Sequence, residues 1–214
     1  MGSEMCIRDR YVTSNMVKLS KEFINSTAVL DIGTTIMNML MVRVAHGVEV
    51  MMTNTPTGIL QRATRYQPPT GNAAGLTRAT ITALFTAVKP PYRNRASFVI
   101  SDQEFNKLIG TPVGNNDQRL VMANSWGDAP FSTLFGRPLE NNFEMPNFGN
   151  GNRSAVYGDI FLYVIRRVPS TREFSIVDSD EASVRNRQIG FQMDEMYAGN
   201  LTQPKAVYAF EGRT

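Results

Sequence analysis

The sequence contains very few of the residues on which catalytic and metal-binding sites most often depend. Among 214 residues there is one cysteine, Cys6, and one histidine, His46. These counts exclude an internal disulfide and a cysteine cluster, and one histidine cannot supply the usual ligands of a zinc site. A Ser-His-acid triad would have to use His46, and no Gly-x-Ser-x-Gly motif is present. We therefore predict that the protein is not an enzyme and has no catalytic residue, cofactor or bound metal.

Long apolar runs and a strong excess of one charge are absent as well. The richest apolar stretch is interrupted by Asn38, Arg43 and His46, so it does not supply the roughly 20 apolar residues that cross a bilayer. No signal peptide is visible, and we expect no association with a membrane. The 22 lysines and arginines are scattered among 19 acidic residues, which gives a net charge of +3. This composition permits contact with DNA but does not indicate it.

Apolar residues in the first part of the chain recur at helical spacing. They predict one helix over residues 27–52, roughly 39 Å long, with Ser26 or Thr27 as its N-cap. The apolar stripe consists of Val29, Ile32, Ile36, Leu40, Val44, Val48 and Met51. Several methionines, among them Met37, Met39 and Met41, lie off this stripe. The helix is therefore apolar over most of its circumference, which indicates burial on more than one side, within the fold or against a neighbour.

Shorter elements follow the long helix. Residues 61–75 are expected to form an exposed connection, and residues 77–88 a second helix that ends at two prolines. A buried strand is predicted at 96–100. Ser101 and Glu104 have the spacing of a capping box, which would open a helix that reaches Ile109.

The rest of the chain reads as strands separated by glycine, proline, asparagine and aspartate. The strand candidates are residues 120–122, 134–135, 161–165, 174–177, 184–193 and 206–210. Helices in the first half and strands in the second favour an α+β fold over repeated βαβ units.

Two polar segments have both a functional and a simpler structural interpretation. The glycine-rich residues 149–152 could form a phosphate cradle, but no helix is predicted after them, so a loop tip is favoured. Asp178, Asp180 and Glu181 could bind Ca²⁺, but no calcium-loop glycine or distal glutamate follows them. A solvated turn is the favoured interpretation there.

Pairs of arginines are the strongest candidates for binding residues. Guanidinium groups make bidentate contacts with carboxylates and phosphates, so such pairs serve subunit interfaces or nucleic-acid backbones. A solvated strand edge is the simpler alternative, and DNA contact is the least favoured of the three. The candidate subunit-interface residues are Arg93, Arg95, Arg166, Arg167, Arg185 and Arg187.

Several short phrases occur in an order that is typical of one family. They are residues 17–26 (VKLSKEFINS), 54–60 (NTPTGIL), 92–96 (YRNRA), 98–101 (FVIS), 135–139 (FGRPL), 145–146 (MP), 157–159 (YGD) and 204–207 (PKAV). Together they resemble the major capsid protein of tailed bacteriophages, the Hong Kong ninety-seven-like fold, over residues 11–214. Residues 192–196 (QMDEM) depart from the family, whose members often have an arginine followed by Asp-Gly near the last strands. Any interface contact assigned to that arginine is in doubt here.

The resemblance implies an architecture. The fold would be α+β, with a peripheral domain made of residues 11–60 and 135–214. That domain would contain the end of an extended loop, a long spine helix and the late strands. An axial α/β domain, residues 61–134, would be inserted between its two parts. Some relatives cross-link their subunits, but no cross-linking residue can be assigned in this sequence.

The resemblance also implies a function. The chain would be a structural subunit that self-assembles into hexamers and pentamers of an icosahedral capsid around viral DNA. Its partners would be copies of itself, a scaffold, a portal, a maturation protease and, non-specifically, packaged double-stranded DNA. It would be located in the virion after assembly in the cytoplasm of the bacterial host. An encapsulin-type nanocompartment shell is the main alternative; a small hydrolase or a monomeric nucleic-acid-binding domain is less favoured.

The first ten residues are interpreted separately. Residues 1–10 (MGSEMCIRDR) resemble a translated sequencing adapter, and a genuine flexible terminus is the alternative. On the first interpretation the chain is an N-terminally truncated fragment. We then expect that it does not form native particles as given, because residues 11–19 would be half of an unpartnered hairpin.

Overall fold

The chain divides into two compact units. The computed structural model describes residues 10–26, 32–68, 75–110, 112–113, 118–119, 121–122, 133–178 and 185–213. Unit 1 combines the first 52 residues with residues 165–199, and unit 2 combines residues 53–164 with 200–214. These bounds differ from the expected domains, since residues 135–164 and 200–214 share a unit with 61–134. Which unit is peripheral or axial in a shell stays a prediction.

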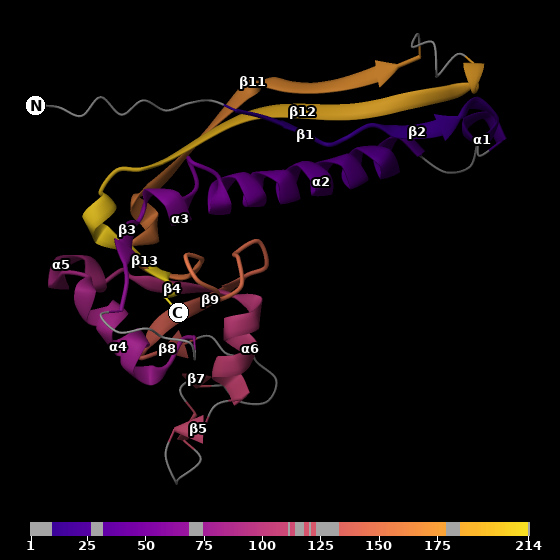
Figure 1. Ribbon diagram of the computed structural model, residues 1–214. Coiled ribbons are helices and arrows are strands. Elements are labelled where there is room, and N and C mark those ends of the chain that lie inside the picture. The colour runs from indigo at the N-terminus through magenta and orange to yellow at the C-terminus, as the bar shows by residue number, and fades with distance from the viewer. Residues whose placement is uncertain are drawn as a thin grey trace, which may run out of the picture. The chain divides into compact units, whose positions relative to one another are not determined.

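Unit 1 is a long helix beside an antiparallel sheet. Helix α2 (Ile32–Asn54) runs along the sheet, as Figure 1 shows. Strand β12 (Gln188–Leu201) lies at the centre and pairs on one side with β11 (Tyr163–Val177). On its other side it pairs with β1 (Arg10–Thr13) and then β2 (Val17–Ser20). The first described segments of the chain are thus strands of this sheet.

The predicted apolar stripe is the buried side of α2. Its members Ile36, Leu40, Val44 and Met51 are buried. The described part of this helix is Ile32–Asn54, and a short helix, α1 (Lys21–Ser26), is described before it; residues 27–31 lie outside the described residues. The hydroxyl of Ser20 accepts a hydrogen bond from the amide of Phe23 at 3.1 Å, which stabilises the first turn of α1. The proposed caps are not tested: Thr27 lies outside the described residues, as does the side chain of Ser26 at the end of α1.

Unit 2 is built on a mixed sheet. Its strand order is β3-β13-β10-β4-β9-β8-β7, in which the pairs β3–β13 and β4–β9 are parallel. The strands are β3 (Thr64–Tyr66), β4 (Ser97–Ser101), β7 (Val121–Met122), β8 (Thr133–Leu134), β9 (Arg137–Asn142), β10 (Arg153–Gly158) and β13 (Val207–Glu211). Strands β5 (Pro112–Val113) and β6 (Gln118–Arg119) form a separate pair. This mixture of helices and sheets confirms the α+β prediction.

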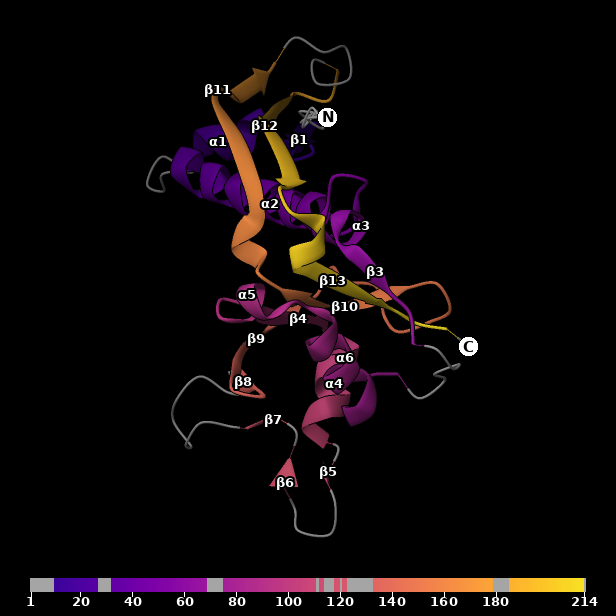
Figure 2. The same cartoon turned by 90° about the vertical axis from the view of Figure 1, so that its left-hand side faces the viewer.

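Helices cover both faces of this sheet. Helices α4 (Arg78–Ala87) and α6 (Asp102–Gly110) lie on one face, and α3 (Ile59–Arg62) lies on the other, as Figure 2 shows. The first core packs Phe98, Tyr157 and Phe210 beneath α4 and α6. Tyr157 stacks on Phe98 with ring centroids 4.1 Å apart. The second core packs small and β-branched strand residues beneath α3; they include Val156, Val207 and Ala209.

Two local expectations for unit 2 are wrong, and a third, that two prolines end the helix at 77–88, is confirmed but incomplete. Residues 61–75 are not only a connection, because β3 lies within them and pairs with β13, far along the chain. The two prolines end α4 but also begin α5 (Pro90–Arg93), since proline suits the first turn of a helix. Ser101 and Glu104 do not form a capping box. The Glu104 carboxylate accepts a hydrogen bond from the amide of Leu76 at 2.8 Å. The buried Ser101 hydroxyl has no hydrogen-bond partner in the part of the chain described.

Two further elements are 3₁₀ turns next to unit 2 strands. They are η1 (Ile160–Leu162) and η2 (Pro204–Ala206). The predicted strand at 161–165 therefore begins as a turn and becomes β11 from Tyr163. The strand predicted at 174–177 is the end of that same 15-residue strand.

Candidate functional site

The six candidate arginines are divided between the two units. Arg93 and Arg95 lie in unit 2, and Arg166, Arg167, Arg185 and Arg187 lie in unit 1. They therefore do not form one cluster within a compact unit. Their surroundings differ enough that each needs its own account.

Arg93 is bound to the backbone of its own unit. Its Nε donates to the carbonyl of Val88 at 2.6 Å, and its Nη2 donates to the carbonyl of Thr86 at 2.8 Å. The guanidinium also lies 5.2 Å from the ring centre of Phe85. These carbonyls belong to the C-terminal end of α4, where a cation offsets the negative end of the helix dipole. Arg93 thus stabilises the end of α4.

Arg95 forms an exposed cation–π pair. Its guanidinium lies 4.8 Å from the ring centre of Phe161, and 72% of the Phe161 side chain is exposed. A large aromatic side chain beside an arginine on an open surface is the composition found at the energetic centres of protein interfaces.

The exposed arginines of unit 1 have weaker contacts. Arg187 is 3.9 Å from the carboxylate of Glu22, and both side chains are more than three-quarters exposed, so this pair contributes little to stability. Arg166 is exposed on β11 and makes no ion pair or hydrogen bond with a described residue. Arg185 is exposed as well.

Arg167 belongs to a cluster around a buried carboxylate. Glu195 on β12 is fully buried, and its Oε1 accepts a hydrogen bond from Arg167 Nε. Its Oε2 accepts from Arg172 Nε and Nη2 at 3.3 and 3.1 Å and from the Tyr197 hydroxyl at 3.0 Å. We call these four residues the Glu195 cluster. Burial raises the pKa of Glu195, but the hydrogen bonds from Arg167, Tyr197 and Arg172 together hold that pKa below its usual value.

Unit 2 contains a second buried carboxylate with two arginines. Glu211 lies 2.5 Å from Arg65 Nη2 and 3.4 Å from Arg153 Nε, and it accepts from Gln67 Nε2 at 3.1 Å. The Nη1 of Arg153 donates to the carbonyl of Leu60. These contacts join β3, β10, β13 and the helix α3.

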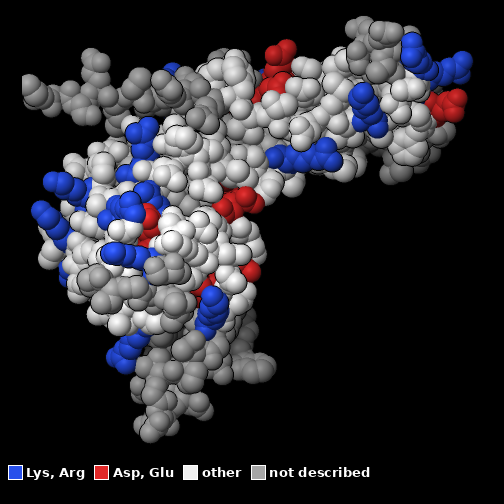
Figure 3. All heavy atoms as spheres, in the orientation of Figure 1, with Lys and Arg blue, Asp and Glu red and all other residues white. Residues whose placement is uncertain are grey.

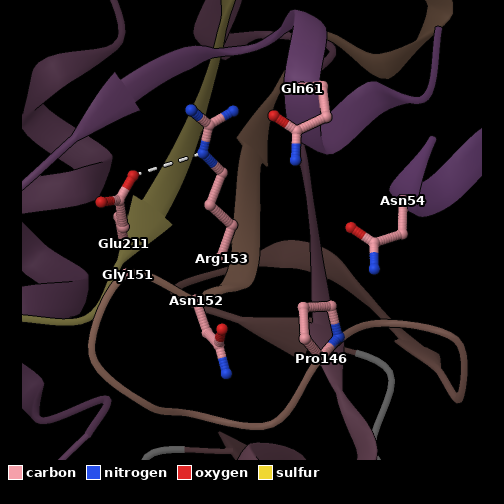
Figure 4. Close-up of a pocket in the computed structure, with 7 residues that line it drawn as sticks. All are labelled: Asn54, Gln61, Pro146, Gly151, Asn152, Arg153 and Glu211. Atoms are coloured by element: carbon pink, nitrogen blue, oxygen red, sulfur yellow. Dashed lines mark hydrogen bonds and ion pairs between the residues drawn. The ribbon is translucent and has the colours of Figure 1, made fainter. Parts of the chain in front are cut away.

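A polar hollow of about 200 Å³ lies beside Arg153 and Glu211. Figure 4 shows the carboxamides of Asn54 and Gln61 directed toward it. Its other lining residues are Pro146, Gly151 and Asn152. The last two belong to the glycine-rich segment, which is a loop before β10, with the amide of Asn152 donating to the carbonyl of Gly149 at 3.1 Å. No helix follows this loop, so the structure agrees with the loop-tip interpretation.

Apolar side chains are exposed along α2. The most exposed is Val42, at 70%. The others are Met37, Met39, Met41 and Val50. Figure 3 shows lysines and arginines scattered over both units with carboxylates between them, as the composition indicated.

The described part of the chain contains neither a candidate metal-binding cluster nor a helix that could span a membrane. Those residues contain no group of three or more His, Cys, Asp or Glu side chains that could hold a metal ion. None of the described helices has both the length and the apolar character needed to span a bilayer. His46 is an exposed residue of α2, and Asp178 forms an exposed ion pair with Lys21 at 2.6 Å.

Comparison with known protein families shows to which family the chain belongs. The model of the Phage capsid family matches residues 11–212. The chain belongs to the phage capsid family. It is a capsid shell subunit, which confirms the family and the function that the ordered phrases indicated. No curated protein matches the chain.

Solved capsid structures have the same fold as this family member. The capsid of an empty GTA particle is 17% identical, with a TM-score of 0.77, over 100% of this chain and 80% of that one. A chain of Gordonia phage Cozz is 13% identical, with a TM-score of 0.69, over 97% and 71%. The holo-SrpI encapsulin complex from Synechococcus elongatus PCC 7942 is also similar, at 12% identity and a TM-score of 0.66, over 96% and 73%.

Sequence reasoning missed several residues of this shell subunit. Arg172, Glu195 and Tyr197 were not singled out, although Glu195 lies two residues from Met193 and Tyr197. Because side chains alternate along a strand, Met193, Glu195 and Tyr197 lie on one face of β12. An acidic residue on that face indicates a buried, paired carboxylate. The exposure of Phe161 had no signal in the sequence.

Proposed function

We propose that this subunit self-assembles into hexamers and pentamers of an icosahedral bacteriophage capsid that encloses double-stranded DNA. On this proposal it has no enzymatic activity, and it is incorporated into the virion after assembly in the host cytoplasm. Scaffold, portal and maturation protease would be its further partners. Family membership supports the proposal, and the titles of the GTA structures describe capsids.

The exposed apolar surface of α2 is the structural observation that best supports self-assembly. Val42 and the neighbouring methionines leave an apolar surface exposed on α2, and exposed apolar patches mark interaction sites. Copies of the chain would cover it. The proposed polar contacts of these interfaces are Arg95, Arg166, Arg167, Arg185 and Arg187. A neighbour contact for Arg93 stays a prediction, because its guanidinium binds carbonyls at the end of α4. Many modest contacts per subunit would close a shell through avidity.

The test uses the longest open reading frame that contains this sequence. Val42→Asp places a charge on the exposed patch, and Asn38→Asp adds the same charge at an exposed polar position of the same helix. We expect Val42→Asp to weaken self-association about tenfold or more in sedimentation velocity, with Asn38→Asp within about twofold of the wild type. Both variants should keep the wild-type melting temperature, since neither position is buried.

Electron microscopy of the same samples tests the shell itself. Closed particles in the wild type and their loss in Val42→Asp support the proposal. A wild-type protein that stays monomeric at every concentration and salt condition, or equal effects of the two variants, would refute it.

An encapsulin-type shell is the alternative function, and the structural similarity to the holo-SrpI encapsulin complex supports it. The contents of purified particles separate the two. Nuclease-resistant double-stranded DNA supports the phage capsid, whereas a stoichiometric cargo protein without DNA supports the nanocompartment.

A further inference from the structure

The Glu195 cluster contains more positive charge and more donors than its carboxylate can use. Two guanidinium groups contact one carboxylate, which leaves a net charge of +1. Glu195 accepts four hydrogen bonds, one at Oε1 and three at Oε2, whereas the two guanidinium groups alone offer more N–H donors than a carboxylate has acceptor sites. Among the residues described, Arg167 uses only Nε, and Arg172 only Nε and Nη2. The remaining guanidinium N–H groups therefore have no acceptor in this part of the protein.

These spare donors are accessible and held in place. The side chains of Arg167 and Arg172 are 44% and 42% exposed, although the carboxylate that binds them is fully buried. Because Glu195 fixes both guanidinium groups, a ligand would not have to order two flexible side chains. The burial of Glu195 has a local cause: it pairs with Val12 of β1, whose side chain lies against Gly47 of α2.

We propose that Arg167 and Arg172, positioned by Glu195, bind a carboxylate from a second copy of this chain. This inference rests on the proposed self-assembly, because it names the chemistry of one contact in it. An incoming carboxylate would accept from the outward Nη groups and compensate the surplus charge, in the short charge-assisted geometry that arginine forks favour.

The surroundings fit a single carboxylate better than a nucleic acid. A polyanion needs a row of cations along its backbone. Elsewhere in unit 1, Lys21 and Arg187 are close to carboxylates of their own chain. Lys21 and Arg187 therefore do not extend the cluster into a row of unpaired cations, and a single carboxylate needs only the two guanidinium groups.

The chain itself presents suitable carboxylates. Glu49 on α2 and Glu140 on β9 are exposed, and neither makes an ion pair or side-chain hydrogen bond with a described residue. Each is therefore available to a neighbouring copy. We take these two residues as the candidate donors.

The first experiment measures carboxylate binding directly. Succinate is titrated into the protein while the ¹H–¹⁵N Nε signals of its arginines are followed. We expect saturable shifts of Arg167 and Arg172 and none of Arg166. Arg172→Lys keeps the charge and a contact with Glu195 but loses the fork, and should weaken succinate binding about tenfold. Arg166→Lys, the matched control on the same strand, should leave the affinity within about twofold.

The second experiment tests whether the ligand belongs to a second copy. Self-association is measured by sedimentation velocity with and without succinate, and for Arg172→Lys, Glu49→Gln and Glu140→Gln. Competition by succinate, with weaker association of Arg172→Lys and of at least one glutamate variant, supports the proposal.

Three outcomes overturn the inference. One is the absence of a saturable shift at Arg167 and Arg172, or an equal loss of succinate affinity in Arg172→Lys and Arg166→Lys. Another is succinate binding that leaves self-association unchanged. A third is inorganic phosphate binding more tightly than succinate, together with DNA binding that Arg172→Lys abolishes. None of these contradicts capsid assembly, since the Val42→Asp test on α2 is independent of this cluster.

Discussion

Gly158 provides the sharpest test of how the unit 2 sheet is built. It ends β10 with a φ of 151°, a conformation that side-chain-bearing residues rarely adopt. A Cβ atom there would meet the carbonyl oxygen of Ala206 and lie 2.6 Å from the Cα of Val207. Both neighbours are fully buried backbone on the adjacent strand or turn, so neither can rotate away as a flexible side chain would.

Two costs should add in Gly158→Ala. The unfavourable backbone conformation costs about 1–2 kcal/mol, and overpacking against fixed backbone costs about 1–3 kcal/mol. We therefore expect the free energy of unfolding to fall by about 2–5 kcal/mol. Separation of β10 from β13 would be the structural consequence, because Gly158 pairs with Val207.

Gly136→Ala is the matched control. Gly136 also has a positive φ, 69°, but a Cβ there would have no heavy atom within 4 Å. It should therefore show only the backbone cost, about 1 kcal/mol. Urea denaturation followed by circular dichroism measures both variants. If Gly158→Ala is no more destabilising than Gly136→Ala, the close approach of β10 to Val207 is wrong.

Three other predictions concern burial and ionisation. Leu40→Ala, at a fully buried position of α2, should lower the free energy of unfolding by about 2–5 kcal/mol, whereas Met39→Ala, half exposed, should lower it by less than about 1 kcal/mol in the same urea assay. Glu195→Gln should cost about 2–3 kcal/mol at neutral pH. Because the pKa of Glu195 is lowered in the folded state, this loss of stability should be complete above pH 4.5, the ordinary pKa of a glutamate. It should vanish as the pH falls through the pKa of Glu195 in the folded protein. A loss that does not change with pH contradicts the prediction. Burial raises the pKa of Tyr163 to about 12, and its hydroxyl donates to the carbonyl of Thr57 at 2.9 Å. The free energy of unfolding of the wild type should therefore fall between pH 10 and 12. The fall should be smaller in Tyr163→Phe, and thermal melts across that pH range measure it.

Elements with a strong local signal could be predicted from the sequence. The α2 stripe was visible because Leu40, Val44 and Met51 repeat at helical spacing and are buried. The end of that helix and the start of α4 were also correct to within a few residues, since both depend on nearby turn and capping residues. Thr77 is the N-cap of α4, and its capping box uses Thr80.

Elements that depend on distant partners could not be predicted in this way. Strand β3 has only three residues, and it is a strand because β13 lies beside it. The capping-box prediction failed for a similar reason. Glu104 has the right spacing for a box with Ser101, but in the fold its carboxylate accepts a hydrogen bond from a loop amide, that of Leu76. Local spacing cannot show which of two possible hydrogen bonds the tertiary structure brings into reach.

The arginines show the same limit at the candidate site. Arg93 and Arg95 are two residues apart, yet one is bound to helix carbonyls and the other lies over an exposed ring. Arg166 and Arg167 are adjacent, but only Arg167 reaches Glu195. An arginine pair in a sequence therefore does not define an interface by itself. What decides its role is whether another strand supplies a buried carboxylate, and at the Glu195 cluster that carboxylate holds two guanidinium groups while leaving their outer donors for a neighbour.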